Sequence, residues 1–200
     1  KEIRLRFIIL TIPDLFDEKM LEQLKDAGLF CVSLGIEAGN DYIRNNVLRR
    51  NLTKEQIIKA CRLIKKYNIL INAQNMIGVP NENITTMYET LEFNIRCNVD
   101  VAIAYLFQPY PRTDIWKHCV ENELFDDNFD RISDTIFSRY ALKSKYRNEF
   151  INFSNLFYIL LKYPALIPLS RILIRLPANK VFNLAGRLFR KAQYKSLGII

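Results

Sequence analysis

The sequence predicts an α/β fold, a partial barrel of parallel strands and helices followed by a helical extension. Strand-like and helix-like patterns alternate four times in residues 1–124, with short connections between them. Such alternation is typical of the βα units that build a parallel sheet. From residue 125 the alternation stops and the chain becomes helical and basic, so we place the extension at 125–200. An open doubly wound sheet would show the same alternation.

The first unit opens with β-branched and apolar residues at Phe7–Ile12, which predict a strand. Asp17 is a good N-cap for a helix through Ala27, and Gly28 is suited to end that helix. The next run, Leu29–Ile36, is apolar on both faces. A strand with this character is expected to be covered on both sides, as in a parallel sheet.

The second helix is predicted to begin after Thr53, because Thr53 and Gln56 have the spacing of a capping box. Its apolar stripe is Ile57, Cys61 and Ile64, and basic side chains occupy the opposite face. This distribution is that of an amphipathic helix with one face on a core.

A third strand is predicted near Ile69–Ile77. Thr86 and Glu89 resemble a second capping box, within a helix that ends near Cys97. The fourth strand is expected near Val101–Phe107, and together these elements complete the strands of the barrel-like part.

Thr113 is predicted to cap a fourth helix, the last element of residues 1–124. In the extension, residues 156–176 are largely apolar but are interrupted by prolines and basic residues. A transmembrane helix needs about 20 mostly apolar residues without such breaks. We therefore expect two short amphipathic helices hinged at the prolines, and a final helix near Asn179–Gln193 with a basic side.

Parallel α/β sheets bind ligands where their strands end and the loops into helices begin. Three such exits are polar or rich in glycine and proline, at Gly35–Asp41, Gly78–Asn83 and Gln108–Thr113. Glu37 is the most informative residue, because an acid at the tip of a buried strand needs a partner. That partner is either the ribose diol or amine of a ligand, or a local arginine or helix end.

The motifs at these exits resemble those of a known family. The strings GIEAG at 35–39, IGVPNEN at 77–83 and PYPRT at 109–113 are similar to GIESG, IGLPGET and PYPGT in the radical S-adenosylmethionine (SAM) superfamily. The resemblance covers roughly residues 7–122 and is greatest for the branch in which many members carry a cobalamin-binding domain. It implies that the four strands are the third to sixth of a six-stranded partial barrel.

The resemblance also implies roles for residues after the first two exits. Glu37 matches the residue that contacts the SAM ribose in such enzymes. Arg49, with its neighbour Arg50, matches a basic residue that contacts the SAM carboxylate in some relatives. A guanidinium group suits this task because it binds a carboxylate through two hydrogen bonds. The alternative is that both arginines lie at a solvated helix end.

Gly78 and Pro80 match the motif where the backbone of relatives passes close to the adenine of SAM. Gln74 lies where some relatives place a polar contact to SAM. Gln108 and Tyr110 follow the last strand and are candidates for contact with substrate, although an aromatic residue before proline is often simple loop packing.

Some motif positions depart from the family pattern. Ala38 replaces a serine, and Asn51, Asn81 and Arg112 stand where glycine is common. Asparagine tolerates the left-handed backbone conformation that glycine allows, whereas arginine does so less readily. These changes weaken the expectation of family-like loop geometry after the last two strands.

The family's cluster motif, CxxxCxxC, is absent from the chain, which therefore supplies no metal ligand by this reading. The cysteines are Cys31, Cys61, Cys97 and Cys119, too far apart for a short metal motif, and we interpret them as buried thiols in a reducing, cytoplasmic compartment. The chain also opens at Lys1 without a methionine. We expect a fragment whose own activity is absent.

The parent enzyme implied by the resemblance binds SAM and a [4Fe–4S] cluster, takes electrons from a reductant, and in the cobalamin-associated branch binds cobalamin too. It would cleave SAM reductively to start a methylation, cyclisation or rearrangement of a small-molecule or lipid-like substrate. Two alternatives remain. One is another α/β-barrel enzyme that binds a phosphate or sugar, and the other is a membrane-associated binding module.

The net charge is concentrated in the extension. Residues 139–200 contain twelve basic residues and one acid, which gives +11 against +8 for the whole chain. Three interpretations fit: a helical cap with solvated lysines, contact with an anionic membrane, and nucleic-acid binding, for which no motif is visible. For the membrane interpretation, the sequence offers four bulky apolar residues: Phe157, Tyr158, Leu160 and Leu161. The only histidine, His118, is expected to be a surface or packing residue.

Overall fold

A computed structural model describes the chain apart from residues 1–4, 129, 131, 133–138 and 200. Four strands form one parallel sheet in chain order: β1 (Phe7–Thr11), β2 (Leu29–Glu37), β3 (Leu70–Ile77) and β4 (Val101–Leu106). The pairing is parallel throughout, with Leu34 opposite Ala73 in β2 and β3. The predicted α/β fold with parallel strands is confirmed.

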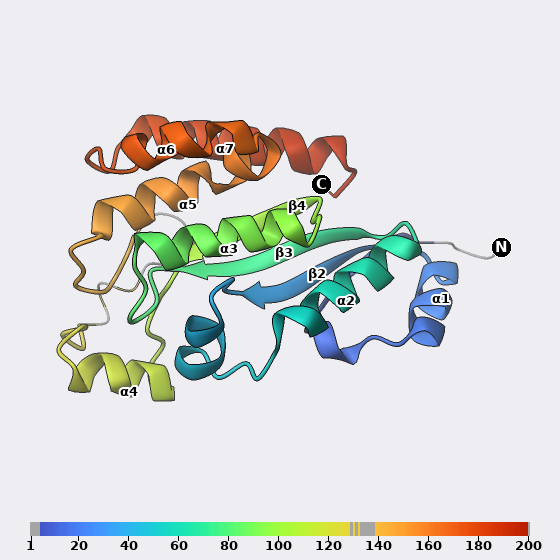
Figure 1. The fold of residues 1–200 in the computed structure, drawn as a ribbon, viewed down its shortest axis with the longest axis horizontal. Coiled ribbons are helices and arrows are strands. Elements are labelled where there is room, and N and C mark those ends of the chain that lie inside the picture. The colour runs from blue at the N-terminus through green and yellow to red at the C-terminus, as the bar shows by residue number, and fades with distance from the viewer. Residues whose placement is uncertain (1–4, 129, 131, 133–138, 200) are drawn as a thin grey trace.

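Helices connect the strands as the sequence predicts. They are α1 (Glu18–Asp26), α2 (Lys54–Lys66), α3 (Ile84–Arg96) and, after β4, α4 (Asp114–Glu121), and Figure 1 shows α2 and α3 running along the sheet. A 3-10 helix (Pro13–Leu15) precedes α1, and a π-helix (Ile43–Val47) lies between β2 and α2.

The predicted caps of three helices are present. Asp17 accepts a hydrogen bond of 2.7 Å from the Met20 amide, and the Thr113 side chain accepts one from Trp116. Thr53 and Gln56 form the predicted capping box at α2. Since these side chains satisfy amides that the helix leaves unpaired, the sequence fixes where the helices begin.

The prediction for the start of α3 was wrong. Asn83 is the N-cap, and its Oδ1 atom accepts from the amides of Thr85 at 2.9 Å and Thr86 at 3.2 Å. Thr86 completes a capping box with Asn83 rather than with Glu89. The helix therefore begins one turn earlier, because asparagine caps as well as threonine. This leaves Glu89 free of capping, and it accepts a hydrogen bond from Asn40.

The extension contains α5 (Arg147–Lys162), a 3-10 helix (Pro164–Leu166), α6 (Ile167–Leu173) and α7 (Lys180–Ser196). The final helix is present where it was expected, and Asn179 caps it. The expectation of two short helices within 156–176 was only partly correct. The break does fall at a proline, but the helix before it has 16 residues and starts well upstream.

Helix α5 belongs to the hydrophobic core of the sheet. Its Phe150, Phe153 and Phe157 are buried among side chains of the strands and of α3. The Ser154 hydroxyl donates a hydrogen bond of 2.6 Å to the Ala104 carbonyl of β4. Helix α5 therefore covers β4, one of the two outer strands of the sheet, and satisfies one of its polar groups.

The burial of α5 corrects one sequence-based expectation. Phe157, Tyr158 and Leu160 are buried, and Leu161 is partly buried. These four side chains were expected to be available to a membrane, but they pack inside the protein. These apolar side chains fill the core instead. A sequence pattern alone does not distinguish apolar side chains that fill a core from apolar side chains that contact a membrane.

Helix α7 packs closely against α5 at a single glycine. Gly186 is buried, and a Cβ atom added to it would clash with the carbonyl oxygen of Asn155 in α5. Figure 1 shows α6 and the first part of α7 beyond α5, whereas Tyr194 near the end of α7 donates a hydrogen bond to Asn72 of β3. The close approach at Gly186 thus fixes the position of the outermost helix.

Replacement of Gly186 by valine is expected to displace α7. The clash is with backbone, which relaxes less easily than a flexible side chain, so we expect a loss of about 1–3 kcal/mol in the free energy of unfolding. Ala192→Val is the matched control, because Ala192 is exposed on the same helix. Chemical denaturation of both variants measures the difference, and equal losses would contradict the packing described here.

Candidate functional site

A cavity of about 610 Å³ lies at the C-terminal edge of the sheet, where the sequence predicts the ligand site. Its walls come from the loop after β2, the ends of β3 and β4, and α4. Seven of the lining residues have polar or charged groups that could contact a ligand: Arg49, Arg50, Asn81, Gln108, Tyr110, Asp114 and His118. Aromatic and apolar side chains supply much of the remaining wall, and this mixture is typical of small-molecule sites.

Glu37 lies at the tip of β2, next to this cavity. The register of β2 against β3 shifts between Gly35 and Glu37, and Glu37 has a φ of 67°. Such a bulge turns a side chain away from the regular alternation of the strand. Glu37 is buried, and its carboxylate forms an ion pair of 2.7 Å with Arg50. Burial raises the pKa of Glu37, and the Arg50 charge opposes part of that rise.

The two predicted arginines point to different partners. Arg50 lines the cavity and forms the ion pair with Glu37. Of the partners expected for Glu37, the local arginine is therefore present. Arg49 is exposed and forms an ion pair of 2.6 Å with Asp114 at the start of α4. Because both members of that pair line the cavity, it connects two sides of the site. Contact of either arginine with SAM stays a prediction.

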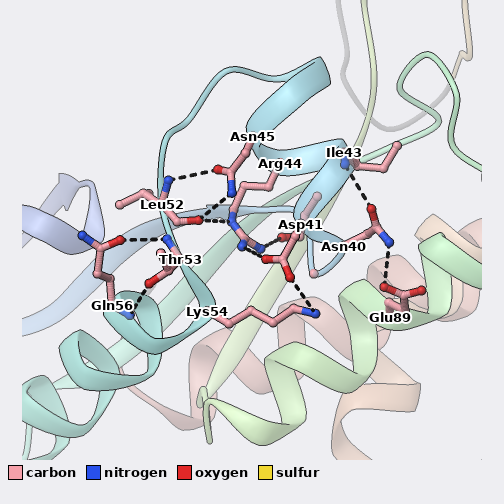
Figure 2. Close-up of polar contacts among 12 residues, drawn as sticks. Asn40, Asp41, Ile43, Arg44, Asn45, Leu52, Thr53, Lys54, Gln56 and Glu89 are labelled. Carbon is pink, nitrogen blue, oxygen red and sulfur yellow. Dashed lines mark hydrogen bonds and ion pairs between the residues drawn. The ribbon is translucent and has the colours of Figure 1, made fainter.

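The loop that carries these arginines is built around Arg44, which is completely buried (Figure 2). Its guanidinium donates to the carbonyl oxygens of Leu52 and Ala38, both at 2.9 Å, and to the Asp41 carboxylate. Lys54 adds a second cation 3.4 Å from Asp41. Arg44 therefore ties the end of β2, the π-helix and the start of α2 together.

Two asparagines complete this loop (Figure 2). Asn45 accepts from the Leu52 amide and donates to the Leu52 carbonyl, each at 3.0 Å. Asn40 accepts from the Ile43 amide and donates to Glu89 of α3 at 2.9 Å. The loop is thus held at both ends by side chains. Sequence analysis missed Arg44, and its only signal was a charged residue between the apolar Ile43 and Val47.

The departures from the family motifs keep the glycine-like backbone. Asn51, Asn81 and Arg112 have φ values of 52°, 65° and 65°, all in the left-handed region. The conformation that a glycine would adopt freely is therefore present at all three positions, held by the surrounding loop at some cost for Arg112. Of these three side chains, Asn81 lines the cavity, whereas Asn51 and Arg112 do not.

Gly78 has a φ of 80°, and its surroundings come from the extension. The Tyr140 hydroxyl donates to the Gly78 carbonyl at 2.8 Å, and a Cβ atom on Gly78 would clash with the Tyr140 ring. Packing against Tyr140 therefore explains the need for glycine here. Pro80 is buried, and neither Gly78 nor Pro80 lines the cavity, whereas Asn81 does. Their proximity to adenine stays a prediction.

Glu82 is a buried acid that sequence analysis did not single out. One of its carboxyl oxygens accepts hydrogen bonds from the Gly78 and Val79 amides, and the other has no hydrogen-bond partner among the described residues. Burial raises the pKa of Glu82 to about 8, against the opposing effect of the two amides. Glu82 holds the turn after β3, and its burial favours the neutral, protonated form of the carboxyl group.

Gln74 and Gln108 differ in how far their polar groups are satisfied. Gln74 accepts a hydrogen bond of 2.6 Å from the Tyr105 hydroxyl of β4. Gln108 is buried in the cavity wall, and its amide nitrogen donates to the Arg139 carbonyl. Its Oε1 atom has no hydrogen-bond partner among the described residues. A buried unpaired acceptor is costly, so this atom is suited to a donor on a ligand.

Tyr110 and His118 stand on the outer wall of the cavity. Tyr110 is 54% exposed, and His118 contacts Asn122 through its Nδ1 atom at 3.2 Å. Both line the cavity. Sequence analysis treated His118 as a surface or packing residue, and its place on α4 beside the site was not visible in the sequence pattern.

The chain offers no set of ligands for an iron–sulfur cluster in its described part. No group of three or more histidine, cysteine or acidic side chains there is arranged to hold a metal. All four cysteines are buried and free, and burial raises the pKa of Cys31 and Cys119 to about 11. Cluster ligands are thiolates, and burial opposes the formation of a thiolate.

Among the helices that the structure describes, none combines the length and the apolar character that a membrane span requires.

Comparison with known proteins finds a family match in the first part of the chain. A family model described as the radical SAM superfamily matches residues 1–93, which include β1, β2, β3, the Arg44 loop and most of α3. These residues match the radical SAM superfamily. The chain is 33% identical to the anaerobic magnesium-protoporphyrin IX monomethyl ester cyclase of Rubrivivax gelatinosus, over 55% of its own length and 20% of the cyclase.

Two solved structures share the fold of this chain. Coproporphyrinogen III oxidase (HemN) from Escherichia coli matches with a TM-score of 0.55 and 17% identity, over 82% of this chain and 32% of HemN. The methyltransferase TsrM from Kitasatospora setae matches with a TM-score of 0.50 and 23% identity, over 59% of this chain and 22% of TsrM. The chain therefore spans a fifth to a third of these three relatives.

Replacement of Arg44 by methionine is expected to destabilise the protein by about 2–5 kcal/mol, because buried carbonyl groups lose their donor. Arg49→Met is the control, since the same change at an exposed ion pair costs at most about 1 kcal/mol. Urea denaturation measures both. An Arg44→Met variant as stable as the control would show that the guanidinium does not hold the loop.

Glu82 is expected to make stability depend on pH. The folded protein keeps Glu82 protonated up to about pH 8, whereas the unfolded chain releases this proton near 4.5. Its contribution is therefore fully present below that lower value and is lost as the pH rises toward 8. We expect the free energy of unfolding of Glu82→Gln to rise progressively relative to that of the wild type between these pH values, because only the wild type loses stability there. Denaturation across this range tests it, and a constant difference would contradict it.

Proposed function

We propose that the cavity binds SAM for a radical SAM enzyme, with substrate at its outer side. The observation that carries this proposal is the Glu37–Arg50 pair, which places a carboxylate and a guanidinium together at the end of a parallel strand, beside a cavity of about 610 Å³. SAM carries ribose hydroxyls, an amine and a carboxylate. The Glu37 carboxylate can accept hydrogen bonds from the hydroxyls or the amine, and the Arg50 guanidinium can donate to the carboxylate.

Each residue has a definite task in this proposal. Glu37 accepts hydrogen bonds from the ribose hydroxyls, and Arg50 turns part of its guanidinium to the SAM carboxylate. Arg49 adds positive charge at the cavity mouth while Asp114 holds it in place. The unpaired oxygen of Gln108 accepts from a donor on the substrate, and Tyr110 covers the outer side.

The iron–sulfur cluster does not fit the residues of this chain. The chain has no CxxxCxxC motif, and its cysteines are buried on separate elements. In this proposal the thiolates that hold the cluster belong to sequence outside these 200 residues. A cluster held there would supply the electron for the reductive cleavage of SAM, and residues of the present chain would bind and orient SAM.

The relatives suggest the range of reactions. One is a cyclase, and the TsrM structure is of a methyltransferase with cobalamin and a [4Fe–4S] cluster bound. We propose cyclisation, methylation or a related rearrangement at an unreactive carbon, with cobalamin as a further cofactor of the parent enzyme if the reaction is methylation.

Titration of SAM into the 200-residue chain by calorimetry tests the proposed site. Glu37→Gln and Arg50→Met are expected to weaken binding about 10- to 100-fold, because each removes a charge-assisted hydrogen bond worth about 1.5–3 kcal/mol. Arg62→Met is the matched control, since Arg62 is exposed on α2 and far from the cavity walls.

The result has clear alternatives. Equal affinities for wild type, Glu37→Gln and Arg50→Met would contradict the assignment of the pair to SAM. Displacement of SAM by a simple sugar phosphate at comparable concentration would instead favour another α/β-barrel enzyme. Thermal denaturation of each variant establishes that the fold survives the substitution.

A further inference from the structure

The outermost helices expose apolar side chains where a soluble helix normally exposes polar ones. Helix α7 turns Val181, Leu184 and Leu188 to the outside, and they are 70%, 51% and 59% exposed. Their spacing of three and four residues puts them on one stripe of the helix. The opposite face of α7, with Gly186 and Tyr194, contacts the protein. The apolar stripe therefore faces away from the core.

Helix α6 and its flanking turns carry a second stripe of the same kind. Leu166, Leu169, Ile172 and Leu176 follow each other at intervals of three or four residues, and all are exposed, Ile172 by 68%. The buried side of α6 is fixed by Ser170, whose hydroxyl is bonded to Tyr88 of α3 at 2.7 Å. We call the two stripes together the α6–α7 face.

The α6–α7 face is also strongly basic. From residue 150 to the end, the chain contains eight lysines and arginines and no acid. On α7, Arg187, Lys191 and Lys195 are exposed on the same side as Val181 and Leu188. Figure 1 shows α6 and α7 along one outer side of the molecule with no other element beyond them, so their outer sides are accessible to a large flat partner.

We propose that the α6–α7 face docks the protein on an anionic lipid bilayer surface. Apolar side chains that alternate with basic ones on an exposed helix match the two layers of such a surface, acyl chains below and phosphate groups above. Long basic side chains reach the phosphates while the leucines enter the interface. A protein partner would have to place acids opposite Arg187, Lys191 and Lys195, whereas an anionic bilayer offers negative charge over its whole surface.

This proposal is independent of SAM binding, because no residue of α6 or α7 is among those that line the cavity. It also replaces the side chains first expected to touch a membrane. Phe157 and Tyr158 are in the core, whereas Ile172, Leu184 and Leu188 are at the surface. The membrane interaction is therefore assigned to a different set of residues on the same extension.

Flotation of the 200-residue chain with vesicles tests the proposal. The vesicles are either pure phosphatidylcholine or equal parts phosphatidylcholine and phosphatidylglycerol, at low salt and at about 1 M salt, where charges are screened beyond about 3 Å. We expect flotation with the anionic vesicles at low salt only. Absence of flotation there would overturn the proposal.

Two pairs of substitutions separate docking from net charge. Ile172→Glu with Leu188→Glu places two acids on the α6–α7 face, whereas Leu10→Glu with Leu15→Glu adds the same charge at exposed leucines of β1 and the following turn. The first pair is expected to abolish flotation and the second to leave it. Equal loss with both pairs would mean that net charge alone acts, which overturns the proposal.

The basic residues are tested separately, and oligomerisation is measured in parallel. Arg187→Gln, Lys191→Gln and Lys195→Gln together should weaken partition to anionic vesicles about 100-fold, since each basic group near such a surface contributes roughly fivefold. If light scattering shows a dimer that Ile172→Glu with Leu188→Glu dissociates, and no flotation is seen, a second copy covers the face and the membrane proposal is wrong.

Discussion

The buried guanidinium of Arg44 is the constraint on which the candidate site depends. A charge that is fully removed from water is tolerated only when its donors are occupied, and here two backbone carbonyls and one carboxylate occupy them. These partners belong to three different segments, so satisfying one side chain fixes the whole loop. Arg50 lies in this loop, so its position is set by the same contacts, and it forms an ion pair with Glu37 at the tip of β2. The electrostatics of the cavity are thus a consequence of a structural arginine.

The extension supports the site from the opposite side. Tyr140 fills the space beside Gly78, and Glu82 holds the same turn through two backbone amides. Phe150 and Phe153 continue the core of the sheet into α5. The extension therefore has two different faces. Its inner face completes the core and the turn after β3, while its outer face carries the apolar and basic side chains of α6 and α7.

The superfamily match and the proposed activity have different kinds of support. The family match covers β1, β2, β3 and the Arg44 loop, whereas β4 and α4, which complete the cavity wall, lie beyond it. The fold similarity to HemN extends into the helices beyond β4. The chain is nevertheless only a fifth to a third of the length of these similar proteins. The proposed SAM binding therefore rests on the residues around the cavity, and the proposed reaction rests on what those proteins are named for.

The sequence by itself determined most of the secondary structure and the edge of the sheet at which the cavity lies. Caps such as Asp17 and Thr53 act on neighbouring amides, and periodicity reports local geometry, so both are readable from a single chain. The strand exits were readable too, because parallel strands end at one edge. The Asn83 cap was missed because Thr86 and Glu89 offered a competing local pattern.

Only the tertiary structure decided which side chains meet. The pairing of Glu37 with Arg50, the burial of Arg44 and the unpaired oxygen of Gln108 depend on how loops fold back on each other. The apolar residues of the extension show the same limit. Phe157 and Ile172 are both large apolar residues in helices of the extension, yet Phe157 lies in the core and Ile172 at the surface. Hydrophobicity drives burial without specifying the partner, and that choice is made when the helices pack.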